Sequence, residues 1–332
     1  MRTVRNVKIA GVGKDLPARV VTSAELEQRL GLEAGWIESR TGVVERRHAT
    51  EETASQLGAR AAMRALEDAG VALEEVDLLI CGSGTPEQTV PSTAVLIQRA
   101  LGPRAEGIPS FDVNSTCLSF VTGVDIAANF IAAGTYRNVL VVSTEVSSCG
   151  LNWDEKESCV LLGDGAAAAL LTPTPEGERS CIYTAAMGTW SSGADLAKLE
   201  GGGSRFHPND PRTRPEQNLF HMEGPKILKY TQKHAIPFVA EYMASLPFGI
   251  AELKALVPHQ ASLLALRIAA RACGFADAQV MENIREHGNC VAASIPLVLH
   301  DSVKNGTIRR GDRILLAGTA AGVSVGTMAV VY

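Results

Sequence analysis

The sequence lacks the features that mark several large classes of protein. It has no apolar run long enough to cross a bilayer. Its first residues, MRTVRNVKIAGVG, place no long apolar core before a small-residue cleavage site, so they do not resemble a signal peptide. Basic residues are not in excess, because 31 lysines and arginines face 36 aspartates and glutamates, a formal net charge of -5. We therefore expect a cytoplasmic protein that neither enters membranes nor binds nucleic acid in general.

Closely spaced cysteines are also missing. The chain has 7 cysteines, an odd number, and no two of them have C-x-x-C spacing. Disulfide frameworks belong to short, cysteine-rich secreted chains, whereas zinc sites and redox pairs use close cysteine pairs. The histidines show no metal-ligand spacing either. We therefore expect no disulfide framework, no metal and no redox cofactor, and we expect most thiols to be buried as small apolar groups.

The remaining composition is that of an ordinary globular protein, and the length suggests two fused domains or one large α/β unit. Of the 332 residues, 46% are hydrophobic and 20% are charged. Strand-like runs rich in Val, Ile and Leu alternate with amphipathic helical segments, which predicts an α/β sheet covered on both faces. The expected strands are 7–12, 76–81, 138–143, 166–171, 253–257, 313–317 and 325–331, and the clearest helices are 53–69, 117–133, 227–243 and 261–273.

The order of elements occurs twice. The first half reads VDLLICGSG, PSTAVLIQRALG, NSTCLSFVTGVDIA and NVLVVSTEVS, and the second reads LKALVPHQ, ASLLALRIAARACG, HGNCVAASIPLVL and DRILLAGTAAG. Both are strand, helix, helix and strand, which indicates an internal duplication and not a solenoid. We therefore predict one half at residues 1–172, another at 219–332, and a loop-rich crossover and cap, rich in Pro and Gly, at 173–218.

Three residues at junctions between a loop and a helix are candidates for chemistry. Cys117, in F-D-V-N-S-T-C-L-S-F, precedes a long helix whose free N–H groups and dipole favour a thiolate. His259 lies in L-V-P-H-Q-A-S and Asn289 in E-H-G-N-C-V-A-A-S-I-P, each just before a helix. Taken singly, they also fit a packing cysteine, a capping histidine and a turn or N-cap asparagine.

As a set, the three residues form a usable acyl-transfer site. A thiolate takes an acyl group from a thioester and holds it as a new thioester. Neutral His and Asn side chains can then donate hydrogen bonds to the enolate oxygen of a second thioester. Asparagine suits this role because it donates at every pH and never becomes charged.

These motifs, in this order, resemble the ketoacyl-ACP synthase III family, and the likeness extends over nearly the whole chain. The resemblance implies the thiolase fold, a duplicated five-layer αβαβα arrangement, and a homodimer. It implies that Cys117 becomes acylated and that His259 and Asn289 assist decarboxylation. The expected reaction joins an acyl-CoA starter to malonyl-ACP or malonyl-CoA by decarboxylative Claisen condensation, with acyl carrier protein as a partner and coenzyme A thioesters as substrates, not cofactors.

The resemblance also implies positions that bind coenzyme A. The motif W-I-E-S-R-T-G-V is similar to the family's entrance, where Trp36 would stack on adenine and Arg40 would meet the phosphates. Lys156 stands where the family has a second phosphate-binding arginine, so the charge is kept but the forked guanidinium is lost.

Further roles follow from the same likeness. The backbone N–H groups of Cys117 and of Ala321, in G-T-A-A-G, would form the oxyanion hole. The acyl channel would be lined by Val90, Leu118 and Gly224. Lys229 and Arg271 match positions that dock acyl carrier protein in the family, although exposed charges on helix faces explain both equally well.

Some positions depart from the family pattern. Ser262 replaces a second asparagine, and Leu118 and Ser119 follow the cysteine where housekeeping synthases have small residues. C-L-S-F, E-H-G-N and G-D-R-I-L-L are closer to the head-to-head condensing enzymes of the olefin pathway. Those enzymes place a glutamate of the partner subunit just before P-S-T, and here that position is Val90, with Glu87 nearby. Val90 therefore argues against the non-decarboxylative route.

Three alternatives stay open at this point. The first is head-to-head condensation of two acyl thioesters. The second is transfer of the acyl group from Cys117 to an alcohol or amine, with His259 as general base and no new C–C bond. The third is a catalytically silent partner subunit, which would be expected to lack the nucleophile that this chain has.

Overall fold

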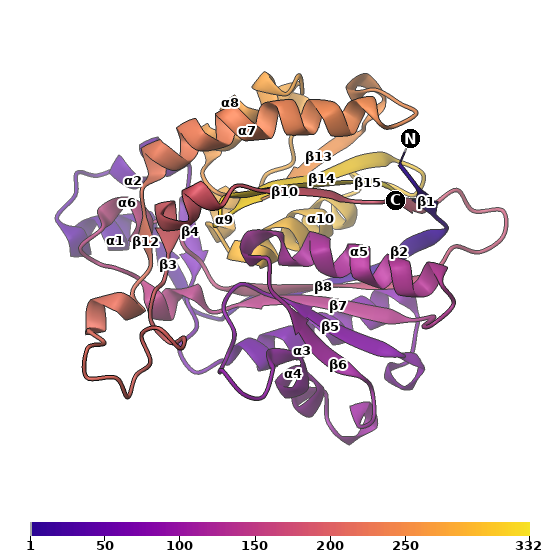
Figure 1. Cartoon of the computed structure of the whole chain (residues 1–332), viewed down its shortest axis with the longest axis horizontal. Coiled ribbons are helices and arrows are strands. Elements are labelled where there is room, and N and C mark those ends of the chain that lie inside the picture. The colour runs from indigo at the N-terminus through magenta and orange to yellow at the C-terminus, as the bar shows by residue number, and fades with distance from the viewer. Residues whose placement is uncertain (1) are drawn as a thin grey trace.

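The structure, a computed structural model, describes residues 2–332 (Figure 1). Its first sheet has five strands in the order β2-β8-β7-β5-β6. In this sheet β5 is parallel to β6 and β7, whereas β8 is antiparallel to β2 and β7. The strands are β2 Val7–Asp15, β5 Leu78–Gly82, β6 Ser110–Val113, β7 Val139–Glu145 and β8 Gly165–Pro173.

The second sheet has six strands, in the order β1-β9-β15-β14-β13 with β10 also paired to β15. Only β13 and β14 are parallel to each other. The strands are β1 Val4–Arg5, β9 Cys181–Tyr183, β10 Ala186–Thr189, β13 Ala255–Pro258, β14 Arg313–Ala320 and β15 Ser324–Val331.

Helices fill the layers between and outside the sheets (Figure 1). The central layer is α5 (Ser119–Ala132) and α10 (Ser294–Lys304), which share one apolar core with both sheets. The outer face of the first sheet is covered by α3 (Ala54–Ala69) and α4 (Thr93–Leu101). The outer face of the second is covered by α7 (Gly224–Ala244) and α8 (Leu263–Ala272). The five predicted layers are therefore present.

The residue pattern explains this layering. Every residue of β5 (LLICG) and of β7 (VLVVSTE) is buried, as continuous apolar runs require in a sheet covered on both faces. Close packing of α3 on β2 depends on two glycines. A Cβ atom on Gly11 would lie 2.4 Å from the Ala65 carbonyl oxygen, and one on Gly13 would lie 2.3 Å from that of Ala61.

Smaller elements gather at one end of the sheets, on the left of Figure 1. Some of them contribute residues to the lining of the cavity described below. The smaller elements are β3 Val20–Thr22, α1 Ser23–Leu30, α2 Trp36–Thr41, β4 Glu45–Arg47, α6 Lys156–Cys159, β11 Ala197–Lys198, β12 His221–Met222 and α9 Ile284–His287. Across residues 2–332, no helix combines the length and apolar character that crossing a membrane requires.

The segment 173–218 contains more regular structure than the sequence predicted. It supplies β9 and β10 to the second sheet, and β11 pairs with β12. Its other residues are mostly loops and single 3-10 turns. The second sheet thus also takes strands from outside 219–332, including β1 near the start of the chain. These strands have two to four residues each, too few for an alternating pattern to be recognised.

Candidate active site

Cys117 lies in a single 3-10 turn, Thr116–Leu118, immediately before α5. The position at the start of a long helix is as predicted. The turn is tight: Thr116 has a φ of 51°, an uncommon value for a residue other than glycine. Two local bonds hold it, since Thr116 N donates to Asn114 Oδ1 at 2.9 Å and Ser119 Oγ donates to Thr116 O at 2.6 Å. The nucleophile candidate is therefore carried by a constrained backbone.

The environment of Cys117 does not favour a thiolate in the free protein. Burial raises the pKa of the thiol to about 12, and the nearby carboxyl of Glu145 adds to the rise. The backbone N–H groups of Cys117 and Ala321 lower the pKa, but by less. Burial therefore acts against the thiolate that the helix terminus was predicted to favour, because desolvation penalises the charged form.

His259 follows directly after β13 and is buried, with 7% of its surface exposed. Its backbone N–H donates to Ala317 O at 2.9 Å. Burial lowers the pKa of the imidazole to about 4, so the ring is neutral at pH 7. Within residues 2–332, its Nδ1 atom has no hydrogen-bond partner. A neutral ring can donate one hydrogen bond without bringing a charge into the site.

Asn289 lies between α9 and the turn that precedes α10. Its Oδ1 atom accepts a hydrogen bond from Val291 N at 2.9 Å. Its backbone is held by Leu161 O, 2.8 Å from Asn289 N, and by Gly163 N, 3.0 Å from Asn289 O. Because the amide oxygen is already engaged, the NH2 group is the part of the side chain left to donate.

Tight backbone contacts bring the three turns together. A Cβ atom on Gly84 would lie 2.9 Å from Val291 Cγ1, beside Asn289, and 3.5 Å from the Cα of Thr116, beside Cys117. Thr116 Oγ1 also donates to Ala321 O at 3.5 Å. Leu118 is packed against Gly318, on the strand next to His259. A Cβ atom on Gly318 would lie 3.4 Å from Leu118 Cδ2. The turn of Cys117 therefore touches the segments that carry the other candidate groups.

One buried acid in this site was not recognised from the sequence. Glu145, at the end of β7, is 0% exposed. It accepts hydrogen bonds from Gly84 N at 2.7 Å, from the N–H and hydroxyl of Thr85, and from Ala292 N at 3.3 Å. Burial raises the pKa of this carboxyl to about 7. The available signal was an acidic residue ending the otherwise apolar strand N-V-L-V-V-S-T-E.

A cavity of about 450 Å³ leads from the surface to the site. Trp36 and Arg40 line its mouth, with the Arg40 guanidinium 5.1 Å from the centre of the Trp36 ring. Gly224 lines its wall, and His259 and Asn289 lie at its inner part. The sequence thus named residues at the mouth and farther inside a single cavity.

Other candidates lie outside the lining of this cavity. Cys117 is partly exposed, Leu118 is buried, and Val90 is 80% exposed on the surface. Lys156 begins α6 and is exposed, while its neighbour Glu157 is the residue that lines the mouth. The structure therefore does not gather Val90, Leu118 and Gly224 around one cavity of the single chain.

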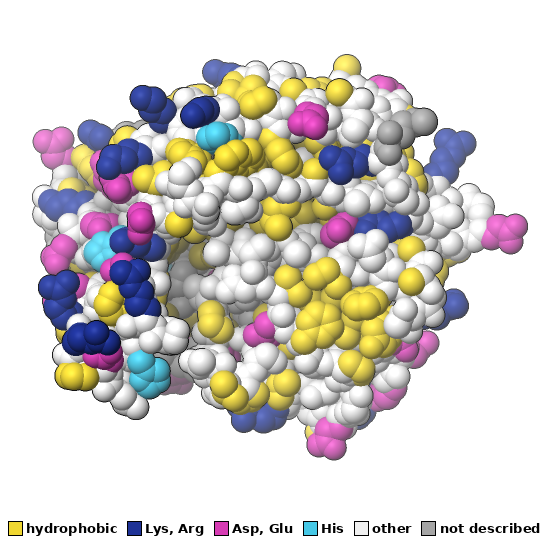
Figure 2. Space-filling model, in the orientation of Figure 1, with side chains coloured by type: hydrophobic (Ala, Val, Ile, Leu, Met, Phe, Trp, Pro, Cys, Tyr) yellow, Lys and Arg dark blue, Asp and Glu magenta, His cyan; other side chains and the backbone are white. Residues whose placement is uncertain are grey.

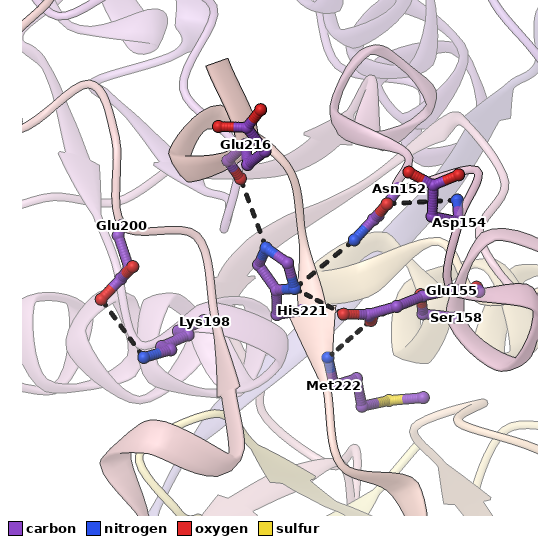
Figure 3. A network of polar contacts seen from close by, with 9 residues as sticks. All are labelled: Asn152, Asp154, Glu155, Ser158, Lys198, Glu200, Glu216, His221 and Met222. Atoms are coloured by element: carbon purple, nitrogen blue, oxygen red, sulfur yellow. Dashed lines mark hydrogen bonds and ion pairs between the residues drawn. The ribbon is translucent and has the colours of Figure 1, made fainter. Parts of the chain in front are cut away.

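The sequence also did not predict a polar network beside the mouth of the cavity (Figure 3). His221 Nδ1 lies 2.5 Å from Glu155 Oε1, and Met222 N donates to Glu155 Oε2 at 3.3 Å. Asn152 Nδ2 lies 3.4 Å from the same ring nitrogen. The hydrogen bond with Glu155 raises the pKa of His221. These bonds hold β12 beside α6, and both Met222 and Glu157 belong to the cavity lining.

Comparisons with known proteins agree with this geometry. The family model for 3-oxoacyl-[acyl-carrier-protein] synthase III matches residues 111–191, and the model for its C-terminal part matches residues 244–332. The chain is 36% identical, over 98% of its length and 97% of the relative, to the beta-ketoacyl-[acyl-carrier-protein] synthase III of Desulfitobacterium hafniense. The chain belongs to the 3-oxoacyl-[acyl-carrier-protein] synthase III family.

Solved structures show the same fold. The 3-oxoacyl-[acyl-carrier-protein] synthase III of Aquifex aeolicus superposes with a TM-score of 0.88 at 33% identity, covering 98% of this chain and 100% of that one. A variant of OleA from Xanthomonas campestris gives 0.87 at 26% identity, covering 99% and 98%. The predictions of the synthase III family, the thiolase fold and an acyltransferase of the condensing type are thus confirmed.

Proposed function

We propose that this synthase III-like enzyme joins an acyl-CoA starter to a malonyl thioester by decarboxylative Claisen condensation. The observation that carries the proposal is the meeting of three turns, those of Cys117, His259 and Asn289, beside one cavity whose lining includes His259 and Asn289. Two of the three side chains are neutral hydrogen-bond donors, which suits an intermediate that carries negative charge.

In the first half-reaction, Cys117 Sγ attacks the carbonyl carbon of the acyl-CoA. The thiol gives up its proton, the C–S bond to coenzyme A breaks, and the departing thiolate is protonated. The raised pKa of Cys117 implies that this proton leaves as the attack proceeds. The neutral imidazole of His259 is the group proposed to relay it. The backbone N–H groups of Cys117 and Ala321 would stabilise the tetrahedral oxyanion.

In the second half-reaction, a malonyl thioester loses CO2. The electron pair of the broken C–C bond moves into the thioester, and the resulting enolate oxygen would accept hydrogen bonds from His259 and Asn289. The enolate carbon then attacks the acyl-Cys117 carbonyl, and the cysteine leaves as thiolate. The fixed Oδ1 of Asn289 supports this role, because it directs the NH2 group away from Val291.

Substrate positions are proposed from the same arrangement. Trp36 and Arg40 would hold the nucleotide of coenzyme A at the mouth, with Lys156 contributing charge from the nearby surface. Malonyl-ACP is proposed as the extender, with malonyl-CoA as the alternative. Of the two docking candidates, Arg271 is engaged by Asp277 at 2.5 Å. Lys229 is therefore the better candidate for contact with acyl carrier protein.

Assembly into a homodimer is proposed from the first sheet. Its edge strand β6 has one free side, and an exposed edge is a ready template for pairing with another copy. Val90, which is 80% exposed, would be covered more naturally by a partner than by water, and it would join the acyl channel with Leu118 from there. The seven free thiols suit a reducing, cytoplasmic compartment. The chemistry proposed above uses thioester substrates and the chain's own groups.

Head-to-head condensation is less well supported. It would need a base to deprotonate an acyl thioester, and Glu87 is the nearest acid to the expected position. The Oε2 atom of Glu87 accepts a hydrogen bond from Ser55 N at 2.7 Å at the start of α3. This carboxylate therefore has a structural partner already.

Intact-mass measurement after exposure to acyl-CoAs tests the proposal. We expect an acyl adduct on the wild-type chain and on Cys149→Ala, an exposed cysteine, but none on Cys117→Ala. The acylated enzyme should then release CO2 from malonyl-ACP and form a β-ketoacyl product. An adduct on the Cys117→Ala protein would refute the assignment of the nucleophile.

A further inference from the structure

The cavity does not end at His259. Beyond it, apolar side chains of α7, α8 and the second sheet continue the lining into what we call the inner lobe, formed by Ala235, Val239, Leu256, Leu266, Ala270 and Phe275. We infer that the inner lobe binds the hydrocarbon chain of a long linear fatty acyl thioester. The inference rests on the proposed function and adds the class of substrate that the site takes. The inner lobe is separate from the acyl channel proposed at Val90 and Leu118, neither of which lines this cavity.

The wall provided by α7 has the form of a groove. Leu228, Thr231, Ala235 and Val239 all line the cavity, and their spacing of three or four residues places them on one stripe of the helix. From Leu228 to Val239 this stripe extends about 17 Å along the helix axis. On α8, residues Leu266 and Ala270 repeat the same spacing. The lobe is therefore elongated between two helices and the sheet, as a linear chain requires.

Packing in this layer is looser than in the layer on the opposite side of the molecule. Leu79 and Ile97, between the first sheet and its outer helices, are 0% exposed. Val239 and Leu266, between the second sheet and α7 and α8, are each 7% exposed although they belong to the core. Protein interiors are normally close-packed, so a layer with open space beside a reaction centre calls for an occupant. Alanines at 235 and 270 leave that space open.

The chemistry of the lining separates an entrance from an apolar interior. The charged groups of the lining are Arg40 and Glu157 at the mouth, while the residues of the inner lobe are all apolar. Thr231 lies between the two regions, and its buried hydroxyl has no partner within residues 2–332. A thioester substrate has the same order of groups, with a polar carrier arm followed by a hydrocarbon chain. Thr231 is therefore a polar point on the otherwise apolar α7 stripe, before the inner lobe.

The test compares variants that fill the lobe with matched variants that do not. Ala270→Leu and Ala235→Leu add bulk to the lobe, whereas Ala272→Leu and Ala240→Leu add the same bulk to exposed positions of the same two helices. Acetyl-, hexanoyl- and dodecanoyl-CoA serve as probes. Each buried methylene contributes about 0.8 kcal/mol, or about fourfold in affinity. We expect the wild-type chain to prefer dodecanoyl-CoA. The lobe variants should lose at least about tenfold in affinity for dodecanoyl-CoA, whereas their affinity for acetyl-CoA should change less than about twofold.

The measurements show which of the two thioester substrates carries the hydrocarbon chain into the lobe. A dodecanoyl adduct on Cys117 that weakens only in the lobe variants supports the inference, with the chain entering on the starter. In the other supporting outcome, dodecanoyl-CoA competes with acetyl-CoA without forming an adduct. If this competition is lost only in the lobe variants, it also supports the inference, and the chain then enters on the second thioester. Equal effects of lobe and control variants, or neither adduct nor competition with dodecanoyl-CoA, would overturn it. Absence of an adduct with every acyl-CoA would instead contradict the proposed function.

Discussion

A methyl group on Gly318 would lie 2.8 Å from the Cβ atom of His259. Strand β14 therefore passes the proposed donor with no room for any side chain. The absence of a Cβ atom at this one position lets the imidazole line the cavity while the neighbouring strand continues to Ala320.

Gly318→Ala should therefore damage catalysis by displacing His259. Overpacking of this kind typically costs about 1–3 kcal/mol of stability, and misplacing a catalytic group by about 1 Å can cost about 100-fold in rate. We expect CO2 release from malonyl-ACP to fall by about that factor. Gly249→Ala is the control, because a Cβ atom there meets nothing within 4 Å. Wild-type CO2 release by Gly318→Ala would show that the position of His259 does not limit the second half-reaction.

Asn289→Asp should impair decarboxylation more than acylation. One carboxylate oxygen can still accept the hydrogen bond from Val291 N, but the other cannot donate and brings negative charge to the enolate. Loss of one such donor typically costs about 100- to 1,000-fold in rate. The measurements are CO2 release and acyl-enzyme formation by mass spectrometry.

The matched control for this substitution is Asn305→Asp. Asn305 Oδ1 accepts from Thr307 N at 2.9 Å in the same local arrangement, but at an exposed position after α10. It should change neither rate. If Asn289→Asp releases CO2 normally, decarboxylative condensation is not the mechanism, and acyl transfer to an alcohol or amine becomes the better hypothesis.

Trp36→Ala should raise KM for acyl-CoA far more than it lowers kcat. The ring lies at the mouth of the cavity, so its removal should weaken ground state and transition state equally. The KM for an acyl-pantetheine, which lacks the nucleotide, should change little in this variant. Trp153→Ala is the control, since Trp153 also pairs with an arginine, Arg29 at 3.4 Å, but lies outside the cavity lining. Equal losses with both substrates would place coenzyme A elsewhere.

Stability should depend on pH through His221. Its pKa is raised above the ordinary value of 6.5 by Glu155, so the protonated ring favours the folded state. This contribution is fully present below pH 6.5 and is lost as pH rises through the folded pKa. The Tm of the wild-type chain should exceed that of Glu155→Gln most at pH 5.5, with the gap closing toward pH 8.5. Because both side chains are partly exposed, the effect should be small.

Glu216→Gln provides the comparison for this experiment. His221 contacts the backbone oxygen of Glu216 and not its carboxylate. The Tm of Glu216→Gln should therefore follow that of the wild-type chain at every pH. A constant gap between the wild-type chain and Glu155→Gln across this range would show that the His221–Glu155 pair does not titrate as described.

Long elements were predictable from the sequence, and short ones were not. The runs at 139–142 and 166–171 are continuous and apolar, so their burial on both faces shows in the residue order itself. The strands β9 and β10 have three and four residues and depend on β15 for pairing. Their structure comes from a partner more than a hundred residues away, which no local pattern records.

The candidate site divides in the same way. Cys117, His259 and Asn289 could be singled out because each lies in a short motif at the start of a helix. Glu145 could not, because its hydrogen bonds come from Gly84, Thr85 and Ala292, on distant loops. The burial that raises the pKa of the Cys117 thiol could not be predicted either, since a helix terminus is local whereas burial is produced by the whole chain.

The sequence by itself determined the family, the order of the elements and the residues able to carry chemistry, because periodicity and motifs are properties of neighbouring residues. The tertiary structure alone decided how those residues meet. The bond from Thr116 to Ala321 joins positions 205 residues apart, and the inner lobe lies between two helices and a sheet from separate segments. Cavity shape and desolvation depend on which distant surfaces exclude water from one another, so they exist only once the chain has folded.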